Sequence, residues 1–240
     1  MRRDHRPFWL RQWHEKLIDL YAAYFLHPQF DGLGKHVKFI APRSVHVNGS
    51  GIYLGNDIHF YALKDKPIHL SVFPDIQPPG KIEIGDFCII NPGVRIIAAN
   101  SIKIGKNCML AGEAYITDAD WHDLYHRIFP PGNTSAVVLE DNVWVGDHAC
   151  ICKGVTVGEN SIIGARAVVA KDVPANSIVA GNPAKIINTL DPAQAKTTRE
   201  ALFTGPVDYV DFKRDYDRTL TKGNSLWRWL ASRLHPTRAD

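Results

Sequence analysis

Between Thr117 and Ala136 the sequence gathers side chains that can move protons, in the segment "TDADWHDLYHRIFPPGNTSA". An imidazole titrates near neutral pH and is the usual general base in enzymes, and a carboxylate beside it can orient the ring or bind hydroxyl groups. The segment has no helical or strand period, and a long loop in a compact fold is usually functional or disordered. The candidate residues here are Asp118, Asp120, His122, Asp123 and His126.

The elements that must hold this loop repeat every six residues. In "LEDNVWVGDHACICKGVTVGENSIIGARAVVAKDVP" an aliphatic residue leads each hexad. Such a period is typical of a parallel β-helix, in which short strands are joined by tight turns. The leading residues are Leu139, Val145, Ile151, Val157, Ile163 and Val169.

Side chains alternate along a strand, so the inside and the outside of the helix can be assigned. Val143 and Val145 should share the inner face, as should Ala149 with Ile151, Val155 with Val157, and Ala167 with Val169. Because three hexads make one coil, residues 18 apart should stack. The outward residues are then Trp144, Cys150, Thr156, Ile162 and Val168. An outward Trp144 indicates a ligand or a subunit contact, and the alternative is a lone surface apolar residue.

Composition narrows the class of protein. The chain has 240 residues, 45% of them hydrophobic, and a net charge of +3. The charges are scattered, so no basic stripe indicates a nucleic-acid partner. The four cysteines, at positions 88, 108, 150 and 152, show no CxxC spacing and are expected to be reduced. We find no apolar run of membrane-spanning length and no signal-peptide pattern, and we therefore expect a cytoplasmic protein.

Three segments are expected along the chain. Residues 1–30 should be an N-terminal helical segment, with an amphipathic helix over 8–26. Residues 31–189 should form the β-helix with the loop 117–136 inserted, and residues 190–240 a helical tail that begins at Asp191 and Pro192. The last helix, in "SLWRWLASRL", is basic and amphipathic, and such a helix can lie on a membrane surface. For both ends we favour packing against the protein itself.

The stretches "DNVWVGDHACICKGVTVGENSIIGARAVVAKDVP" and "VAGNPAKII" resemble the hexapeptide-repeat acyltransferases, a family that includes the galactoside and maltose O-acetyltransferases and polysaccharide-modifying acetyltransferases. The resemblance covers about Ile84 to Ile187. It implies a left-handed parallel β-helix, a homotrimer, and active sites between neighbouring subunits with acetyl-CoA in the groove. The hand comes from the resemblance alone, since parallel crossovers are nearly always right-handed.

The resemblance also implies the residues that handle the acceptor. The family's catalytic histidine lies in the loop that holds His122, which would be the general base. Counting hexads against the galactoside enzymes places that histidine at Trp121 instead, and this departure leaves His126 as an alternative base. Asn91 matches a family asparagine at the acceptor site, although a turn asparagine needs no function to explain it. Asp120 and Trp121 are expected to bind the acceptor.

For the cofactor, the resemblance implies contacts from Trp144, Asp147, Ala165, Lys171 and Lys185. Trp144 would lie beside the acyl-CoA, Ala165 against the pantetheine arm, and the two lysines near the nucleotide phosphates. Asp147 stands where the galactoside enzymes have serine, so that contact differs. Asn188 replaces the next basic residue of the family. Plain surface charge is the alternative explanation of the lysines.

The expected activity is transfer of an acetyl group from acetyl-CoA to a hydroxyl of a saccharide-containing acceptor, with a histidine base and no required metal. One alternative is a zinc enzyme on the same scaffold, like the γ-class carbonic anhydrases. It would draw on His122, His126 and His148, whose spacing does not match that family. The other alternative is a trimeric scaffold without catalytic activity.

Overall fold

The computed structural model describes residues 4–74, 79–128, 131–206 and 209–235. Contacts within the chain divide it into two units. One consists of residues 1–21 together with 200–240, and the other runs from Ala22 to Arg199. We call the first the terminal unit and the second the β-helix unit, and each is described by itself.

The β-helix unit is built from three sheets whose neighbouring strands are parallel, apart from one pair at the C-terminal end. The first sheet contains β1 (Gly32–Leu33), β4 (Ile52–Leu54), β7 (Lys81–Ile84), β10 (Ser101–Ile104), β13 (Val137–Leu139) and β16 (Thr156–Val157). The second contains β2 (Lys38–Ile40), β5 (His59–Tyr61), β8 (Ile89–Ile90), β11 (Met109–Leu110), β14 (Trp144–Val145), β17 (Ile162–Ile163), β19 (Ser177–Ala180) and β20 (Lys185–Thr189). The third contains β3 (Val45–Asn48), β6 (Ile68–Val72), β9 (Arg95–Ala98), β12 (Tyr115–Thr117), β15 (Cys150–Ile151) and β18 (Val168–Val169).

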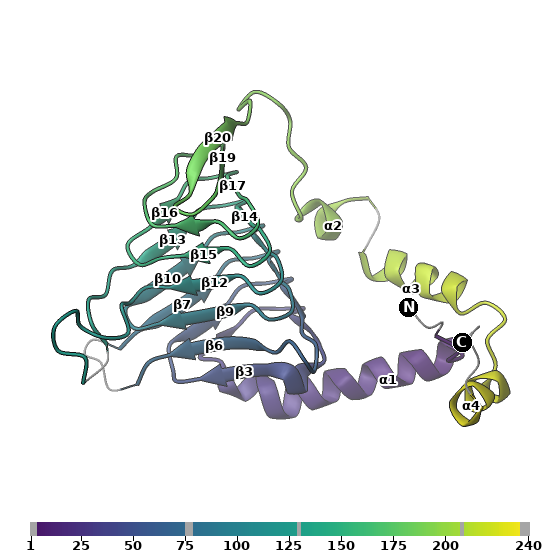
Figure 1. Cartoon of the computed structure of the whole chain (residues 1–240). Helices are drawn as coiled ribbons and strands as arrows, with labels where there is room; N and C mark the ends of the chain where they lie inside the picture. The colour runs from purple at the N-terminus through teal and green to yellow at the C-terminus, as the bar shows by residue number, and fades with distance from the viewer. Residues whose placement is uncertain (1–3, 75–78, 129–130, 207–208, 236–240) are drawn as a thin grey trace. The chain divides into compact units, whose positions relative to one another are not determined.

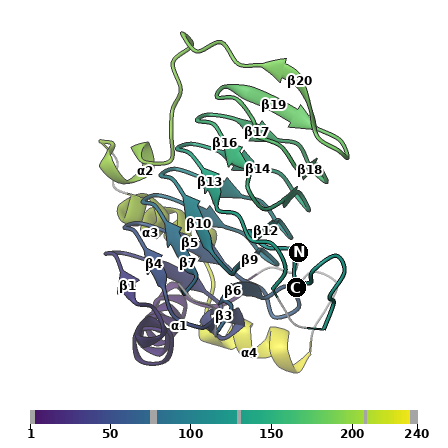
Figure 2. The ribbon, with the colours of Figure 1, turned by 90° about the vertical axis from the view of Figure 1, so that its left-hand side faces the viewer.

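The chain visits the three sheets in turn, so each coil adds one strand to each sheet (Figure 1). Figure 2 shows the first sheet face on, with β4, β7, β10, β13 and β16 rising in sequence order. The architecture is a left-handed parallel β-helix, as predicted.

The predicted alternation is confirmed. All six leading residues of the hexads are 0–1% exposed and belong to one continuous core. Trp144 is the direct neighbour of Ile162 on the adjacent strand, and Cys150 is the direct neighbour of Val168. Residues 18 apart therefore stack as predicted. Three hexads of six residues make one coil, so each outward position recurs on the neighbouring strand one coil later.

The first coil is closed by aromatic packing. The chain enters the β-helix unit through a π-helical turn, Ala22–Leu26, in which Ala22 and Leu26 are buried. Phe30, Phe39 and Phe60 then stack from coil to coil, with ring centroids 5.8 and 4.9 Å apart. The predicted helix 8–26 is accordingly divided into an α-helix, α1 (Phe8–Tyr21), and this turn.

Beyond the β-helix, the expected helix start at Asp191 and Pro192 is wrong. The Asp191 carboxylate accepts a hydrogen bond from the backbone of Ala193, two residues on, and closes a turn instead. The described residues up to His235 then contain three helices: α2 (Ala201–Thr204), α3 (Tyr209–Leu220) and α4 (Leu226–Leu234). Ser225 caps α4 by accepting a hydrogen bond from the backbone N–H of Arg228. Among the described residues, no helix has the length and hydropathy needed to cross a membrane.

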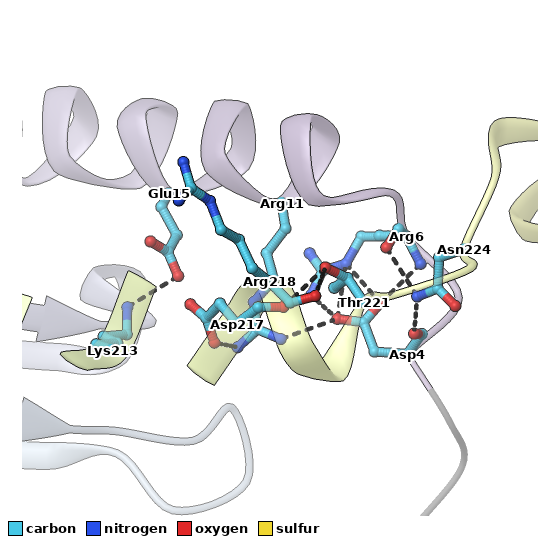
Figure 3. A network of polar contacts seen from close by, with 9 residues as sticks. All are labelled: Asp4, Arg6, Arg11, Glu15, Lys213, Asp217, Arg218, Thr221 and Asn224. Atoms are coloured by element: carbon cyan, nitrogen blue, oxygen red, sulfur yellow. Dashed lines mark hydrogen bonds and ion pairs between the residues drawn. The ribbon is translucent and has the colours of Figure 1, made fainter. Parts of the chain in front are cut away.

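In the terminal unit, α1 and α3 are joined by charged side chains (Figure 3). Arg11 lies 2.8 Å from the buried Asp217, and Lys213 lies 2.9 Å from Glu15. The side chain of Asn224 donates hydrogen bonds to the backbone carbonyls of Asp4 and Arg6. The two ends of the chain thus share one unit, whereas the sequence suggested a separate segment at each end.

Candidate active site

The loop that follows β12 is anchored at its base by a buried carboxylate. Asp118 is fully buried and accepts hydrogen bonds from the backbone N–H groups of Ala99 (2.7 Å) and Asn100 (2.8 Å). On the returning side of the loop, the N–H of Ser135 donates to the carbonyl of Asp118. Burial raises the pKa of Asp118, and the backbone donors act in the opposite direction. Asp118 therefore fixes the loop and does not face an acceptor hydroxyl.

The other two aspartates of the loop also have partners. Asp120 lies 3.0 Å from the ammonium group of Lys153. Asp123 accepts hydrogen bonds from the backbone N–H groups of Tyr125 and His126, which also lowers the pKa of Asp123. Within the described part of the chain, none of the three carboxylates is hydrogen-bonded to the imidazole of His122. The expectation that one of them orients His122 therefore has no counterpart in the structure.

A close crossing of the chain presents His122 to solvent. Gly132 donates its N–H to the carbonyl of Asp120, and a Cβ at Gly132 would overlap the carbonyl oxygen of His122. Only glycine leaves room for this approach, because real Cβ atoms do not come so close to backbone atoms. His122 and His126 are both exposed in this loop, and the structure leaves both as candidates for the base.

Trp121 attaches the loop to the outer face of the third sheet. Its indole N–H donates to the Tyr115 hydroxyl at 3.1 Å, and its ring lies 5.7 Å from that of Phe73. Tyr115 in turn lies beneath the guanidinium of Arg95, at 4.4 Å from the ring centroid. Trp121 was predicted to bind the acceptor, and the structure gives it a contact with the sheet from the position next to His122.

Sequence reasoning missed Arg95 and its neighbours. Arg95 stands in an outward row of the third sheet that continues through His69 on one side and Tyr115 on the other. The rings of His69 and His46 stack at 4.9 Å, and burial lowers the pKa of His69, as do His46 and Arg95. The strand register of the early coils would have predicted this row. The irregular sequence between Val37 and Phe73 hides that register, because the six-residue period cannot be followed there.

A second group of predicted residues lies on the second sheet and at the corner that follows it. Trp144, on β14, is 45% exposed between Met109 and Ile162. Asn91 follows β8, and its side-chain amide donates to the carbonyl of Leu110 at 2.8 Å, so part of its hydrogen-bonding capacity is structural. At the same corner a Cβ on Gly146 would lie 2.7 Å from the nitrogen of Ala165, which shows how closely these coils stack.

Charged residues surround this corner. The Nδ1 of His148 lies 2.6 Å from a carboxylate oxygen of Asp147, and Lys66 lies 2.9 Å from Glu113. The hydrogen bond with Lys66 lowers the pKa of Glu113 and raises that of Lys66. Asp147 thus orients the imidazole of His148, a residue that the sequence suggested only as a possible zinc ligand. Among the described residues, no three side chains of His, Cys, Asp or Glu are grouped to hold a metal ion.

The two groups lie at opposite ends of the strands of the third sheet. The loop with His122 follows β12, whereas Asp147 and His148 precede β15. Because β12 and β15 are parallel neighbours, the first group lies past their carboxyl ends and the second before their amino ends. Figure 1 shows this separation, with the loop leaving the β-helix on the left and β14 and β17 on the right. Within one chain, the two groups of predicted residues therefore do not meet.

The two predicted phosphate-binding lysines are also separated. Lys185 begins β20, which pairs antiparallel with β19 and is exposed along its length. Lys171 follows β18 of the third sheet, at the same ends of the strands as the loop. Lys185 therefore belongs with the sheet of Trp144, and Lys171 lies on the side of His122.

Comparison with known proteins agrees with this architecture. The family model described as "Bacterial transferase hexapeptide (six repeats)" matches residues 136–171. Galactoside O-acetyltransferase of Escherichia coli is 31% identical over 124 residues, which are 48% of this chain and 61% of that protein. Putative acetyltransferase YJL218W of Saccharomyces cerevisiae is 34% identical over 130 residues, 51% of this chain and 66% of that protein. The matches thus span less than two thirds of these relatives.

A solved structure has the same fold at low sequence identity. It is a point mutant of AntD, an N-acyltransferase from Bacillus cereus, in complex with dTDP and coenzyme A. The TM-score is 0.56 at 18% identity, over 80% of this chain and 92% of that one. The hexads, the three parallel sheets and this likeness define a left-handed parallel β-helix protein. The sequence matches add that about half of the chain is similar to proteins named as acetyltransferases, and that residues 136–171 match a bacterial transferase hexapeptide model.

Proposed function

We propose that the protein is an acyl-CoA-dependent O-acetyltransferase that acts on a hydroxyl group of a saccharide or saccharide-containing metabolite. The sequence relatives support this, since they include proteins named as a galactoside O-acetyltransferase and a putative lipopolysaccharide biosynthesis O-acetyl transferase of Escherichia coli. The observation that carries the proposal is the exposed His122 on a loop that Asp118 and Gly132 fix to the β-helix. A loop held in this way can present a base at a constant place.

The proposed reaction needs one proton to move. His122 takes the proton of the acceptor hydroxyl while the oxygen attacks the thioester carbonyl of acetyl-CoA. Backbone N–H groups stabilise the negative charge that develops on the carbonyl oxygen. When the tetrahedral intermediate collapses, the carbon–sulfur bond breaks, and the sulfur of CoA receives the proton from the imidazolium. The products are the acetyl ester and free CoA.

Acetyl-CoA would bind along the second sheet. Trp144, Asp147 and Ala165 line one continuous stretch of this sheet and its corner, and Lys185 follows at the end of the same sheet. Trp144 offers an aromatic surface to the acyl-CoA, and Lys185 a cation to its phosphates. Lys171 would act from the other side of the groove. An enzyme that uses acetyl-CoA would act in the cytoplasm, where its cysteines would be thiols.

A homotrimer would bring the two groups of predicted residues together. A closed three-fold ring places the loop of one subunit beside the second sheet of the next, and it generates three equal grooves. The outward rows Trp144–Ile162 and Cys150–Val168 are then covered by a neighbour. In this arrangement His122 and Trp144 of one site come from different subunits, which accounts for their separation within one chain.

An assay with a panel of acceptors would also distinguish O-acetyl transfer from N-acyl transfer, from a zinc enzyme and from a scaffold without activity. The fold relative AntD is named an N-acyltransferase, so amine acceptors belong in the panel beside hydroxyl acceptors. A zinc enzyme of the γ-carbonic-anhydrase kind would use His122, His126 and His148, and stoichiometric zinc in the purified protein would favour it. A scaffold without activity would release no CoA with any acceptor.

The test measures thiol release from acetyl-CoA with the full chain and a panel of free sugars, nucleotide sugars and amino sugars. We expect release that depends on a hydroxyl acceptor, and a product ester that alkali cleaves. Release with amine acceptors alone, giving a product stable to alkali, would replace O-transfer by N-transfer. Release no faster than the acceptor-free blank across the whole panel would contradict the proposed activity.

A further inference from the structure

Helix α1 is packed with its polar side inward and its apolar side outward. Arg11 and Glu15 on one side form ion pairs with Asp217 and Lys213 of α3 (Figure 3). The opposite side carries a stripe of large apolar residues, and Trp13 is 63% exposed. The exposed stripe consists of Trp9, Trp13, Leu17 and Leu20. Apolar surface of this size on a helix usually marks an interaction site.

Helix α4 has a second apolar surface with arginines on both sides. Trp227 is 79% exposed and Leu234 is 73% exposed. At about 100° per residue, Leu226 and Leu230 fall on the same arc as these two. Arg228 lies beyond one edge of the arc and Arg233 beyond the other. Cations that flank an apolar arc are the pattern of a helix that lies in a membrane interface.

The cations near these surfaces differ from the other cations of the terminal unit. Among the described residues of the unit, five cations form ion pairs: Arg6, Arg11, Lys213, Arg214 and Arg218. Four exposed cations form none with a described residue: Lys16 at the edge of the α1 stripe, and Lys222, Arg228 and Arg233 around α4. From Lys222 to His235 the sequence contains no acidic residue. The unpaired positive charge is thus gathered beside the exposed apolar residues.

The net charge of the chain is distributed unequally between the two units. The terminal unit contains twelve Lys and Arg against nine Asp and Glu, and the β-helix unit contains sixteen of each. The net charge of +3 therefore belongs entirely to the terminal unit. An occupant of this surface should be apolar in its interior and negatively charged at its boundary.

We infer that the terminal unit binds the surface of an anionic lipid bilayer through the apolar faces of α1 and α4. Tryptophan side chains prefer the boundary between headgroups and acyl chains, which suits Trp9, Trp13 and Trp227. Arg228 and Arg233 would meet the lipid phosphates while the leucines enter the acyl region. A second copy fits less well, because an isologous contact would bring these cations against themselves. The β-helix unit has no net charge that complements them.

Binding to vesicles is the direct test, and it needs no acyl transfer, so it is independent of the proposed activity. The full chain is sedimented with vesicles of phosphatidylcholine alone and of phosphatidylcholine with about a third phosphatidylglycerol. We expect binding to the anionic vesicles only, with loss of binding at high salt because the Debye length shortens. Arg233→Gln should weaken binding by about fivefold, the effect of one basic side chain at an anionic surface.

Matched variants test the two parts of the surface. Arg214→Gln removes the same charge from an ion-paired arginine of the same unit, and it should leave binding within about twofold. Trp227→Gln should weaken binding by about tenfold, whereas Leu63→Gln, at an exposed residue of the β-helix unit, should not. Circular dichroism of each variant checks that its helices are intact.

Three outcomes would overturn the inference. One is binding to neutral vesicles as tight as to anionic ones. The second is equal weakening by Arg233→Gln and Arg214→Gln, which would indicate general charge attraction. The third is an absence of vesicle binding by the full chain, and if Trp227→Gln then changed the oligomeric state, the α4 face would be a contact between copies of the chain.

Discussion

At the scale of single residues, the structure distinguishes groups that hold the loop from groups that are free to react. Asp118 and Asp123 use their carboxylates on backbone N–H groups, and Asp120 is paired with Lys153. His122, next to them in sequence, has none of these contacts and is exposed. An exposed imidazole on an anchored loop is suited to accept a proton from a ligand that binds beside it.

The first prediction concerns this imidazole. His122→Ala should lower kcat by about 10²-fold or more, because a positioned general base contributes at least that much. The affinity for CoA, measured by calorimetry, should stay nearly unchanged, since most of the residues proposed to bind the cofactor lie on or beside the second sheet, away from His122. His148→Ala removes the imidazole that is paired with Asp147 and serves as the matched variant. Near-normal turnover in His122→Ala would move the assignment to His126 or to His148, whichever variant then loses activity.

At the scale of elements, short-range periods in the sequence determine the β-helix. The path of the loop is determined instead by contacts between residues that lie outside the repeat. The six-residue period and the two-residue alternation correctly predicted which side chains enter the core, down to the Trp144–Ile162 pair. Both periods are local, so every hexad indicates again which of its side chains point into the core. The contacts of Asp118 with Ala99 and Asn100 join segments 18 or 19 residues apart that lie outside the repeat, and no local pattern encodes them.

The ends of the chain show the same limit. The sequence predicted amphipathic helices at both ends, and α1, α3 and α4 exist. It also predicted that their apolar sides pack on the protein, whereas Trp13 and Trp227 are exposed. Periodicity locates the apolar side of a helix but does not say what covers it, because that depends on partners distant in sequence. The pairing of Arg11 with Asp217, which turns the polar side of α1 inward, spans more than 200 residues.

The alternation within one strand can be tested with two adjacent isoleucines. Ile163 on β17 is fully buried, and its neighbour Ile162 points outward. Ile163→Ala should lower the free energy of unfolding by about 2–5 kcal/mol through lost burial and a cavity. Ile162→Ala should cost about 1 kcal/mol or less in the dissociated chain. Denaturant titrations of both variants measure the difference, and the reverse order of the two effects would contradict the assigned inside and outside.

The path by which the loop returns to the β-helix depends on Gly132. A methyl group there would meet the carbonyl oxygen of His122, so Gly132→Ala should displace the loop while the three sheets stay intact. We expect kcat to fall at least about tenfold, since small displacements of a catalytic group are costly. The melting temperature should change by only a few degrees, about 1 kcal/mol in a domain of this size. Asn133→Ala is the control, because only its backbone carbonyl contacts Asp120. Equal activity of the two variants would show that the crossing at Gly132 does not position the base.

At the scale of the whole molecule, the central claim is that one active site takes His122 from one subunit and Trp144 from the next. It rests on the parallel pairing of β12 with β15. The loop of His122 follows the carboxyl end of β12, whereas Trp144 lies on β14 of the second sheet, from which the chain enters β15 at its amino end. A single chain cannot bring them together without breaking the sheet. A ring of three chains can, and it also covers the outward rows that contain Trp144 and Cys150.

Subunit mixing tests this claim most directly. His122→Ala and Trp144→Ala chains are each expected to be nearly inactive at acetyl-CoA concentrations well below the KM of the natural enzyme. Co-expressed in equal amounts, they should form mixed trimers in which about a quarter of the sites have both residues intact, if subunits combine at random in a closed three-fold ring. The account predicts recovery of about a quarter of the natural activity. Mixed trimers, proven by two different affinity tags, that are no more active than the separate variants would contradict it.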